Sequence, residues 1–157
     1  MLRHVYNLLW YPALPVALAA TGARDRDDRR QRLGHLTIDP ITPAAGAASL
    51  RIWIHAASVG EIEAVRPIAA GLRRQHPHAS IVITTMTVTG RDAARRRIAD
   101  ASAWALAPLD CPRTVRTCRS RVRPHLVLIT ETELWPNYFL ESRRAGARIA
   151  IVNGRMS

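Results

Sequence analysis

The sequence contains no lysine. All 23 of its basic side chains are arginine, and against 12 aspartate and glutamate residues they give a formal net charge of +11. Two interpretations stay open. A GC-rich coding bias produces arginine without any functional meaning. Alternatively, guanidinium groups bind phosphate in a bidentate fashion, so such a surface attracts anionic partners.

Aromatic residues are also scarce, at 5% of the chain. Most of them lie in an apolar N-terminal segment or beside an acidic segment near residue 131. Proteins that bind nucleic acid through stacking interleave aromatic and basic side chains on one surface. Because that pattern is absent, a nucleic-acid partner is not expected, although the charge keeps it as a third hypothesis.

Cysteine is limited to Cys111 and Cys118, whose spacing matches no metal motif and which are too few for a disulfide framework. We interpret them as reduced, structural cysteines of a cytosolic domain. The sequence also lacks the G-x-G-x-x-G, Walker A and H-E-x-x-H patterns. No cofactor and no metal are therefore expected.

No hydrophobic run is long enough for an ordinary membrane span. Residues 5–20 form an uncharged stretch of 16 residues, interrupted by Pro12 and Pro15, whereas a spanning helix needs about 20 apolar residues. Five arginines and three aspartates follow within residues 24–32. The stretch is an interfacial anchor, a cleaved signal peptide ending near Ala17-Leu18-Ala19, or a buried helix of the domain. The length of this stretch and the arginines that follow it favour the anchor. An anchor predicts an anionic membrane surface as partner, and it predicts a location at the cytoplasmic face of the inner membrane.

The 157 residues, 48% hydrophobic and 22% charged, suffice for one domain with a real core. We expect a membrane-associating segment and basic stretch at 1–36, a linker rich in proline and alanine at 37–49, and a Rossmann-like domain at 50–157. Apolar runs at 50–56, 81–86, 103–107, 125–130 and 147–153 alternate with helical patterns at 60–75, 90–99, 113–122 and 134–145. This alternation predicts an α/β fold, a doubly wound parallel sheet preceded by an apolar N-terminal helical segment. Eight residues are expected in the sheet's core: Ile52, Ile54, Val82, Ile83, Val127, Leu128, Ile149 and Ile151.

Polar segments follow four of these apolar runs, and ligands of doubly wound sheets bind at the carboxyl ends of the strands. In the first segment, Ser58 and Glu61 fit a capping box, in which serine caps a helix and glutamate reaches back. Alternatively, Ser58 and Gly60 bind substrate, with Gly60 letting a ligand approach the backbone, while Glu61 acts as a general base. The sequence leaves both interpretations open.

The other three segments carry the remaining candidate residues. Thr87, Thr89 and Gly90 follow the second strand; the threonines cap a helix, or they bind sugar hydroxyls or phosphate oxygens. Glu131 and Glu133 follow the most hydrophobic strand. They complement a helix dipole, or together with the aromatic Trp135 they form part of a sugar site. The last segment, at 153–157, contributes Asn153 and Arg155.

These segments, at 55–61, 84–90, 131–137 and 153–157, resemble in order and spacing the N-terminal half of the 3-deoxy-D-manno-octulosonic acid (Kdo) transferases. The resemblance extends back to the basic stretch at 29–34. It implies half of a GT-B glycosyltransferase that transfers Kdo from CMP-Kdo to a lipid A precursor in lipopolysaccharide synthesis, without a metal. It also implies that Glu61 is the catalytic base and that Glu131 and Glu133 support substrate binding.

In that family a second domain supplies most of the donor site. A chain that stops after a strand is therefore expected to be an incomplete enzyme, inactive without the donor domain. The alternative function is a non-catalytic module that binds anionic lipid.

Overall fold

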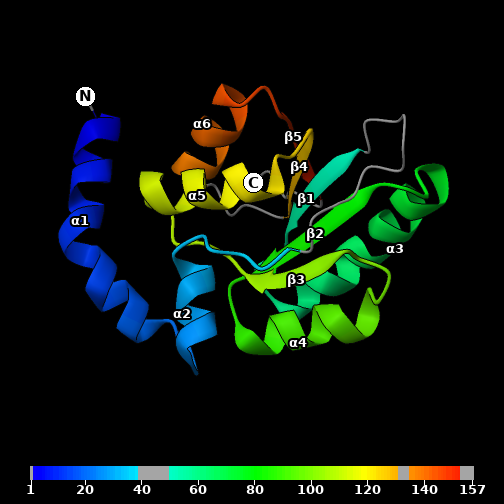
Figure 1. Ribbon diagram of the computed structural model, residues 1–157, viewed down its shortest axis with the longest axis horizontal. Helices are drawn as coiled ribbons and strands as arrows, with labels where there is room; N and C mark the ends of the chain where they lie inside the picture. The colour runs from blue at the N-terminus through cyan, green and yellow to red at the C-terminus, as the bar shows by residue number, and fades with distance from the viewer. Residues whose placement is uncertain (1, 39–49, 131–134, 153–157) are drawn as a thin grey trace, which may run out of the picture.

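Five parallel strands form one sheet in the order β3-β2-β1-β4-β5 in the computed structural model, which describes residues 2–38, 50–130 and 135–152 (Figure 1). The strands are β1 (Arg51–His55), β2 (Ser80–Thr85), β3 (Ala103–Leu106), β4 (Leu126–Thr130) and β5 (Arg148–Val152). The chain runs outward from β1 to β3 and then crosses back to β4. The predicted α/β fold with a parallel sheet is confirmed, and the strand order reverses beside β1, where such sheets bind ligands.

Helices cover both faces of this sheet. On one face, α3 (Val59–Gln75) and α4 (Val88–Arg97) pack apolar side chains such as Ile62 and Ala94 against β1 and β2. On the other face, α5 (Pro112–Val122) and α6 (Pro136–Arg144) bury Val115 and Tyr138 against Trp53. The strands between these layers are apolar on both sides, as is usual in parallel sheets.

Six of the eight residues expected in the core are buried; Ile149 and Ile151 are not. Ile149 is partly buried, and Ile151 is 48% exposed. The prediction for Ile151 was wrong because β5 has a neighbouring strand on one side only within the described chain. An apolar run predicts a strand, but it does not tell an inner strand from an outer one.

The basic stretch contains a helix that its composition did not predict. In α2 (Arg26–Arg32), Asp25 caps the first turn by accepting a hydrogen bond from the Asp28 amide. Arg32 is fully buried, and its guanidinium group donates to the carbonyl oxygens of Ala107 at 3.0 Å and Met86 at 2.5 Å. Burial lowers the pKa of Arg32. This arginine therefore joins α2 to the segments that follow β2 and β3, whereas the other four arginines of the stretch are exposed.

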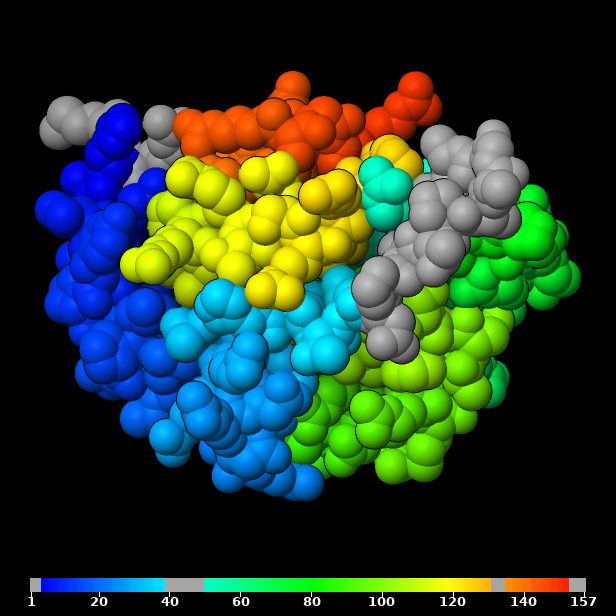
Figure 2. Space-filling model, viewed as in Figure 1, coloured from blue at the N-terminus to red at the C-terminus, as the bar shows by residue number. Residues whose placement is uncertain are grey.

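The apolar N-terminal segment forms α1 (Leu2–Ala20), which contains both prolines and runs along one side of the molecule (Figures 1 and 2). Its exposed apolar side chains are Val5, Leu8, Leu9, Tyr11 and Val16, each more than half exposed. The interpretation of this segment as a buried helix was therefore wrong. Among the described helices, none is both long and apolar enough to cross a membrane.

Candidate functional site

Glu61 lies in the first turn of α3, beside the carboxyl ends of β1 and β4. It is 6% exposed, and its carboxylate accepts hydrogen bonds at both oxygens. Oε2 accepts from the Ala57 amide at 2.7 Å and from the Thr130 hydroxyl at 2.5 Å, while Oε1 accepts from the Ser58 hydroxyl at 3.1 Å. Three donors therefore hold the carboxyl group in one orientation.

The capping interpretation accounts for part of this geometry. Ser58 is the N-cap of α3 and accepts from the Glu61 amide, and the Glu61 side chain reaches back past Ser58 to the amide of Ala57. Capping does not account for Gly60. Gly60 is exposed, and a Cβ there would meet nothing closer than the Ser58 hydroxyl at 3.9 Å. Packing within the described chain therefore does not require a glycine at this position.

Thr87 is the N-cap of α4 and accepts a hydrogen bond from the Gly90 amide at 3.0 Å. Thr87 and Thr89 are both exposed, and their hydroxyl oxygens lie 3.2 Å apart. Gly90 is buried, and a Cβ there would lie 2.9 Å from the Thr87 hydroxyl and 3.2 Å from Cβ of Thr85. Close packing against these threonines therefore explains the glycine at position 90.

The first two predicted segments lie side by side on the same edge of the sheet. The Met86 amide donates to the Ala57 carbonyl at 3.1 Å, and the Ala56 amide donates to the Thr84 carbonyl. Thr130 at the end of β4 reaches the same place through Glu61. Glu131, Glu133, Asn153 and Arg155 lie outside the described residues.

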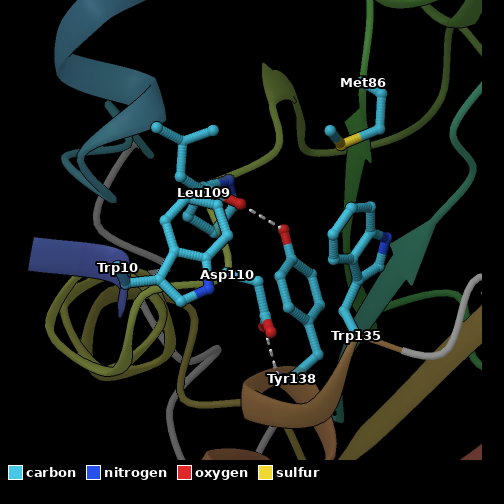
Figure 3. Close-up of a pocket in the computed structure, with 7 residues that line it drawn as sticks. Trp10, Met86, Leu109, Asp110, Trp135 and Tyr138 are labelled. Atoms are coloured by element: carbon cyan, nitrogen blue, oxygen red, sulfur yellow. Dashed lines mark hydrogen bonds between the residues drawn. The ribbon is translucent and has the colours of Figure 1, made fainter. Parts of the chain in front are cut away.

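A small apolar cavity lies next to this edge, and Trp135 is one of its lining residues (Figure 3). Its side chains converge from α1, from the segment after β3 and from the start of α6, and include Trp10, Leu109 and Tyr138. The cavity measures about 20 Å³, which is room for about one water molecule. With α1 in this position, the cavity cannot hold a sugar ring.

Asp110 is a buried acid that lines this cavity, and it was not among the residues predicted from the sequence. Its carboxylate accepts from the backbone amides of Asn137 at 3.1 Å and Tyr138 at 3.2 Å, so it caps α6 across the fold. It also accepts from the Tyr6 hydroxyl of α1 at 2.8 Å. Burial raises the pKa of Asp110 to about 6, although these hydrogen bonds oppose the shift, and burial likewise raises the pKa of Tyr6 to about 12.

A second polar contact holds α1 at the same point. The Asn137 side chain donates to the Asn7 side chain at 3.0 Å and to the Asp110 carbonyl at 2.6 Å. Asp110 and Asn137 therefore connect α1 to the start of α6. The position of Asp110, four residues after a strand on the ligand-binding edge, was the sequence signal that could have identified it.

Buried polar side chains lie below the edge of the sheet that carries Glu61. Thr84 is fully buried; its hydroxyl accepts from the Trp53 indole at 2.8 Å and lies 3.2 Å from Nδ1 of His55. The His55 ring lies 5.1 Å from the Tyr138 ring, measured between centroids. Within the described residues, no three histidine, cysteine or acidic side chains are placed to hold a metal ion.

Comparison with known proteins shows the family. The family model for 3-deoxy-D-manno-octulosonic-acid transferase (kdotransferase) matches residues 27–157. The 3-deoxy-D-manno-octulosonic acid transferase of Haemophilus influenzae is 38% identical over 163 residues, covering 100% of this chain and 37% of that protein. The enzyme of the same name from Bordetella pertussis is 34% identical over 68% of this chain and 26% of its own length. That from Chlamydia trachomatis serovar D is 31% identical over 68% of this chain and 25% of its own length.

The chain thus spans between a quarter and 37% of the length of these relatives. The family match includes all of α2 except Arg26 and every strand of the sheet, and with them the edge that carries Glu61. On these matches, the chain belongs to the 3-deoxy-D-manno-octulosonic acid transferase family.

Proposed function

We propose that this chain provides the acceptor side of a glycosyltransferase that moves Kdo from CMP-Kdo to a hydroxyl of a lipid A precursor. The reaction inverts the anomeric centre and uses no metal. Most of the donor site belongs to a second domain that is not in this chain, so the chain alone is inactive. Family membership and the partial coverage of longer relatives support this proposal.

The observation that carries the proposal is the oriented carboxylate of Glu61 beside the exposed backbone of Gly60. In the reaction, the acceptor oxygen attacks the anomeric carbon of Kdo and Glu61 takes its proton. The bond from that carbon to the phosphate oxygen breaks, and CMP leaves with the electron pair. The bond from the Ser58 hydroxyl to Oε1 is at the part-buried side of the carboxylate, so an acceptor hydroxyl can replace it.

The remaining candidate residues bind substrate in this proposal. Exposed Thr87 and Thr89 offer hydroxyl groups on the same edge as Glu61. Trp135 follows the acidic residues Glu131 and Glu133 in the sequence. Asn153 and Arg155 follow β5, whose carboxyl end is on this edge.

The test is Glu61→Gln in this chain joined to the donor domain of a Kdo transferase. Glutamine keeps the acceptor for the Ala57 amide and can donate to Ser58, but it cannot take a proton. We expect sugar transfer to fall by about 10²–10⁴-fold, with a stability change of about 1 kcal/mol or less. Glu63→Gln is the matched control, because Glu63 lies on the same helix with its side chain 45% exposed. Near-normal transfer by Glu61→Gln, or a loss that only follows the unfolded fraction, contradicts the proposal.

We also propose that the chain acts at the cytoplasmic face of the inner membrane, with α1 against an anionic lipid surface. The support is the row of exposed apolar side chains on α1, next to four exposed arginines of residues 24–32. The same observation favours the alternative function, a non-catalytic module for anionic lipid. A joined protein that binds lipid but transfers no Kdo even with Glu61 intact would support that alternative.

A further inference from the structure

A cluster of basic side chains lies at the edge of the sheet opposite Glu61, where β1 and β4 begin. Arg51 is the first residue of β1, His125 precedes β4, and Arg119 and Arg123 lie at the end of α5. These four residues line a hollow of about 480 Å³ together with Ser120 and two apolar residues. None of the described residues that line it is acidic.

In this hollow, the His125 ring contacts two nitrogen atoms of Arg51. Nδ1 of His125 lies 3.1 Å from the backbone nitrogen of Arg51, and Nε2 lies 3.0 Å from Nη2 of the same arginine. Both arginine groups can only donate, whereas a neutral imidazole has one nitrogen that accepts and one that donates. In either tautomer of a neutral imidazole, one of the two contacts therefore brings donor against donor, and neither arginine group supplies an acceptor.

The other arginines add donors to the same place. Nε of Arg119 is buried and has no hydrogen-bond partner within the described residues. Nε of Arg51 donates to the Arg123 carbonyl at 2.6 Å, and Nε of Arg123 lies 3.4 Å from the Ser120 carbonyl. These bonds satisfy carbonyl groups at the end of α5, which is a structural role for two Nε atoms. They leave the donor pair at His125 and the buried Nε of Arg119 unaccounted for.

Arg123 also occupies a costly backbone position. It has φ 47° and ψ 53°, and among the described residues it is the one non-glycine residue with positive φ. Glycine is the usual residue at this position after a helix, because other side chains are strained there. The backbone conformation at position 123 therefore favours glycine, yet the residue there is arginine.

We propose that this hollow binds a phosphate-type oxyanion through Arg51, Arg119, Arg123 and His125. Such an anion supplies several acceptor oxygens and negative charge among donors that have no carboxylate partner in the hollow. The site is distinct from the proposed acceptor site, because it lies at the amino ends of the strands and Glu61 lies at the carboxyl ends. It does not depend on the transfer reaction.

The test measures binding of inorganic phosphate to the full chain by NMR titration, at an ionic strength held constant with sodium chloride. We expect saturable shifts at His125 and its neighbours. Arg119→Gln and Arg123→Gly should each weaken binding by about tenfold, the effect of losing one charge-assisted hydrogen bond. Arg123→Gly should also keep or raise the melting temperature, because glycine relieves the left-handed strain. It therefore separates binding from folding.

Arg96→Gln is the matched control, since Arg96 is an exposed arginine on α4, outside the hollow. Vesicles of phosphatidic acid, compared with phosphatidylcholine, test whether a lipid headgroup supplies the phosphate. Binding of either probe that depends on Arg119 and Arg123, but not on Arg96, supports the site. The proposal is overturned if neither probe binds in this way, or if Arg96→Gln weakens binding as much as the other two variants.

Discussion

Gly34 and Gly60 differ in the space that their surroundings leave for a Cβ atom. At Gly34, φ is +86°, and a Cβ would lie 2.1 Å from the Thr114 carbonyl oxygen and 2.8 Å from the Cys118 amide nitrogen. At Gly60 the nearest atom would be 3.9 Å away. Gly34 lets α2 and the following chain pack onto the backbone of α5, whereas Gly60 serves no packing contact in the described chain.

Gly34→Ala should lower the free energy of unfolding by at least about 2 kcal/mol, because left-handed strain and a backbone clash combine. Gly60→Ala, the matched control, should be neutral or slightly stabilising, because alanine is the better helix former. Urea denaturation of both variants measures the difference. Equal stability of the two would show that α2 does not pack on α5 as described.

Gly60→Ala carries a second expectation in the protein joined to a donor domain. If a substrate approaches the backbone beside Glu61, the added methyl group should reduce transfer by about tenfold or more, by analogy with other overpacked sites. Stability should stay unchanged. Normal transfer by this well-folded variant would show that substrate does not approach Gly60.

At the residue scale the sequence predicted Glu61 as a site residue because a serine, a glycine and a glutamate follow an apolar run, and its catalytic role stays a prediction. It could not give the donors that orient the carboxylate, since Thr130 comes from a strand 69 residues away in sequence. Asp110 was missed for a similar reason. Its role depends on Tyr6 and Asn137, which meet it only in the folded chain.

At the scale of elements, α1 is held by a few contacts centred on Asp110. Tyr6 and Asn7 provide polar contacts, and Trp10 lines the small cavity. The helix exposes five large apolar or aromatic side chains to solvent: Val5, Leu8, Leu9, Tyr11 and Val16. An element with so little buried surface should open before the sheet does.

Tyr6→Phe removes the donor to Asp110, and we expect faster hydrogen exchange across α1 with little change in the strands. The lost bond should cost about 1 kcal/mol. Tyr11→Phe is the matched control, because Tyr11 is on the same helix and 64% exposed. Unchanged exchange in Tyr6→Phe would mean that this bond does not hold α1.

Asp110 should also make stability depend on pH. Its pKa in the folded chain is about 6, above the unfolded value, so the folded state binds the proton more tightly. Its contribution is complete below pH about 4 and is lost as the pH rises through about 6, with an upper bound of about 3 kcal/mol. Asp110→Asn imitates the protonated acid, so the difference between its unfolding free energy and that of the unaltered chain should grow over this window. If the difference in unfolding free energy did not change with pH, the raised pKa of Asp110 would be refuted.

The elements themselves were largely predictable. Apolar runs gave all five strands, and the helical patterns gave α3 to α6 to within a few residues, because periodicity reflects burial directly. The helix α2 was not predicted, since seven residues rich in arginine and aspartate have no apolar face. Its stability comes from Asp25 and from the buried bonds of Arg32, which only tertiary structure supplies.

At the scale of the whole molecule, positive charge and exposed apolar surface occur together near α1. The net charge of +11 attracts anionic surfaces, and the exposed face of α1 offers Leu8 and Leu9 for insertion. Binding at the surface is the mode that these features favour.

The chain should therefore bind anionic liposomes, and more weakly as salt rises, because the Debye length falls from about 10 Å at 0.1 M to about 3 Å at 1 M. Leu8→Glu combined with Leu9→Glu should reduce binding by about tenfold or more. Ile151→Glu is the matched control, an exposed apolar residue on β5. Binding that ignores salt, or that survives the double change, argues against an interfacial α1.

Because Trp10 of α1 lines the cavity, its fluorescence reports whether α1 is in place. Trp10 and Trp135 line the same cavity, whereas Trp53 is buried in the sheet and Trp104 lies on β3. Detachment of α1 moves one indole out of this cavity and changes the surroundings of a second. Emission from the unlabelled chain therefore follows the helix directly, and Trp10→Phe identifies which part of the spectrum belongs to it.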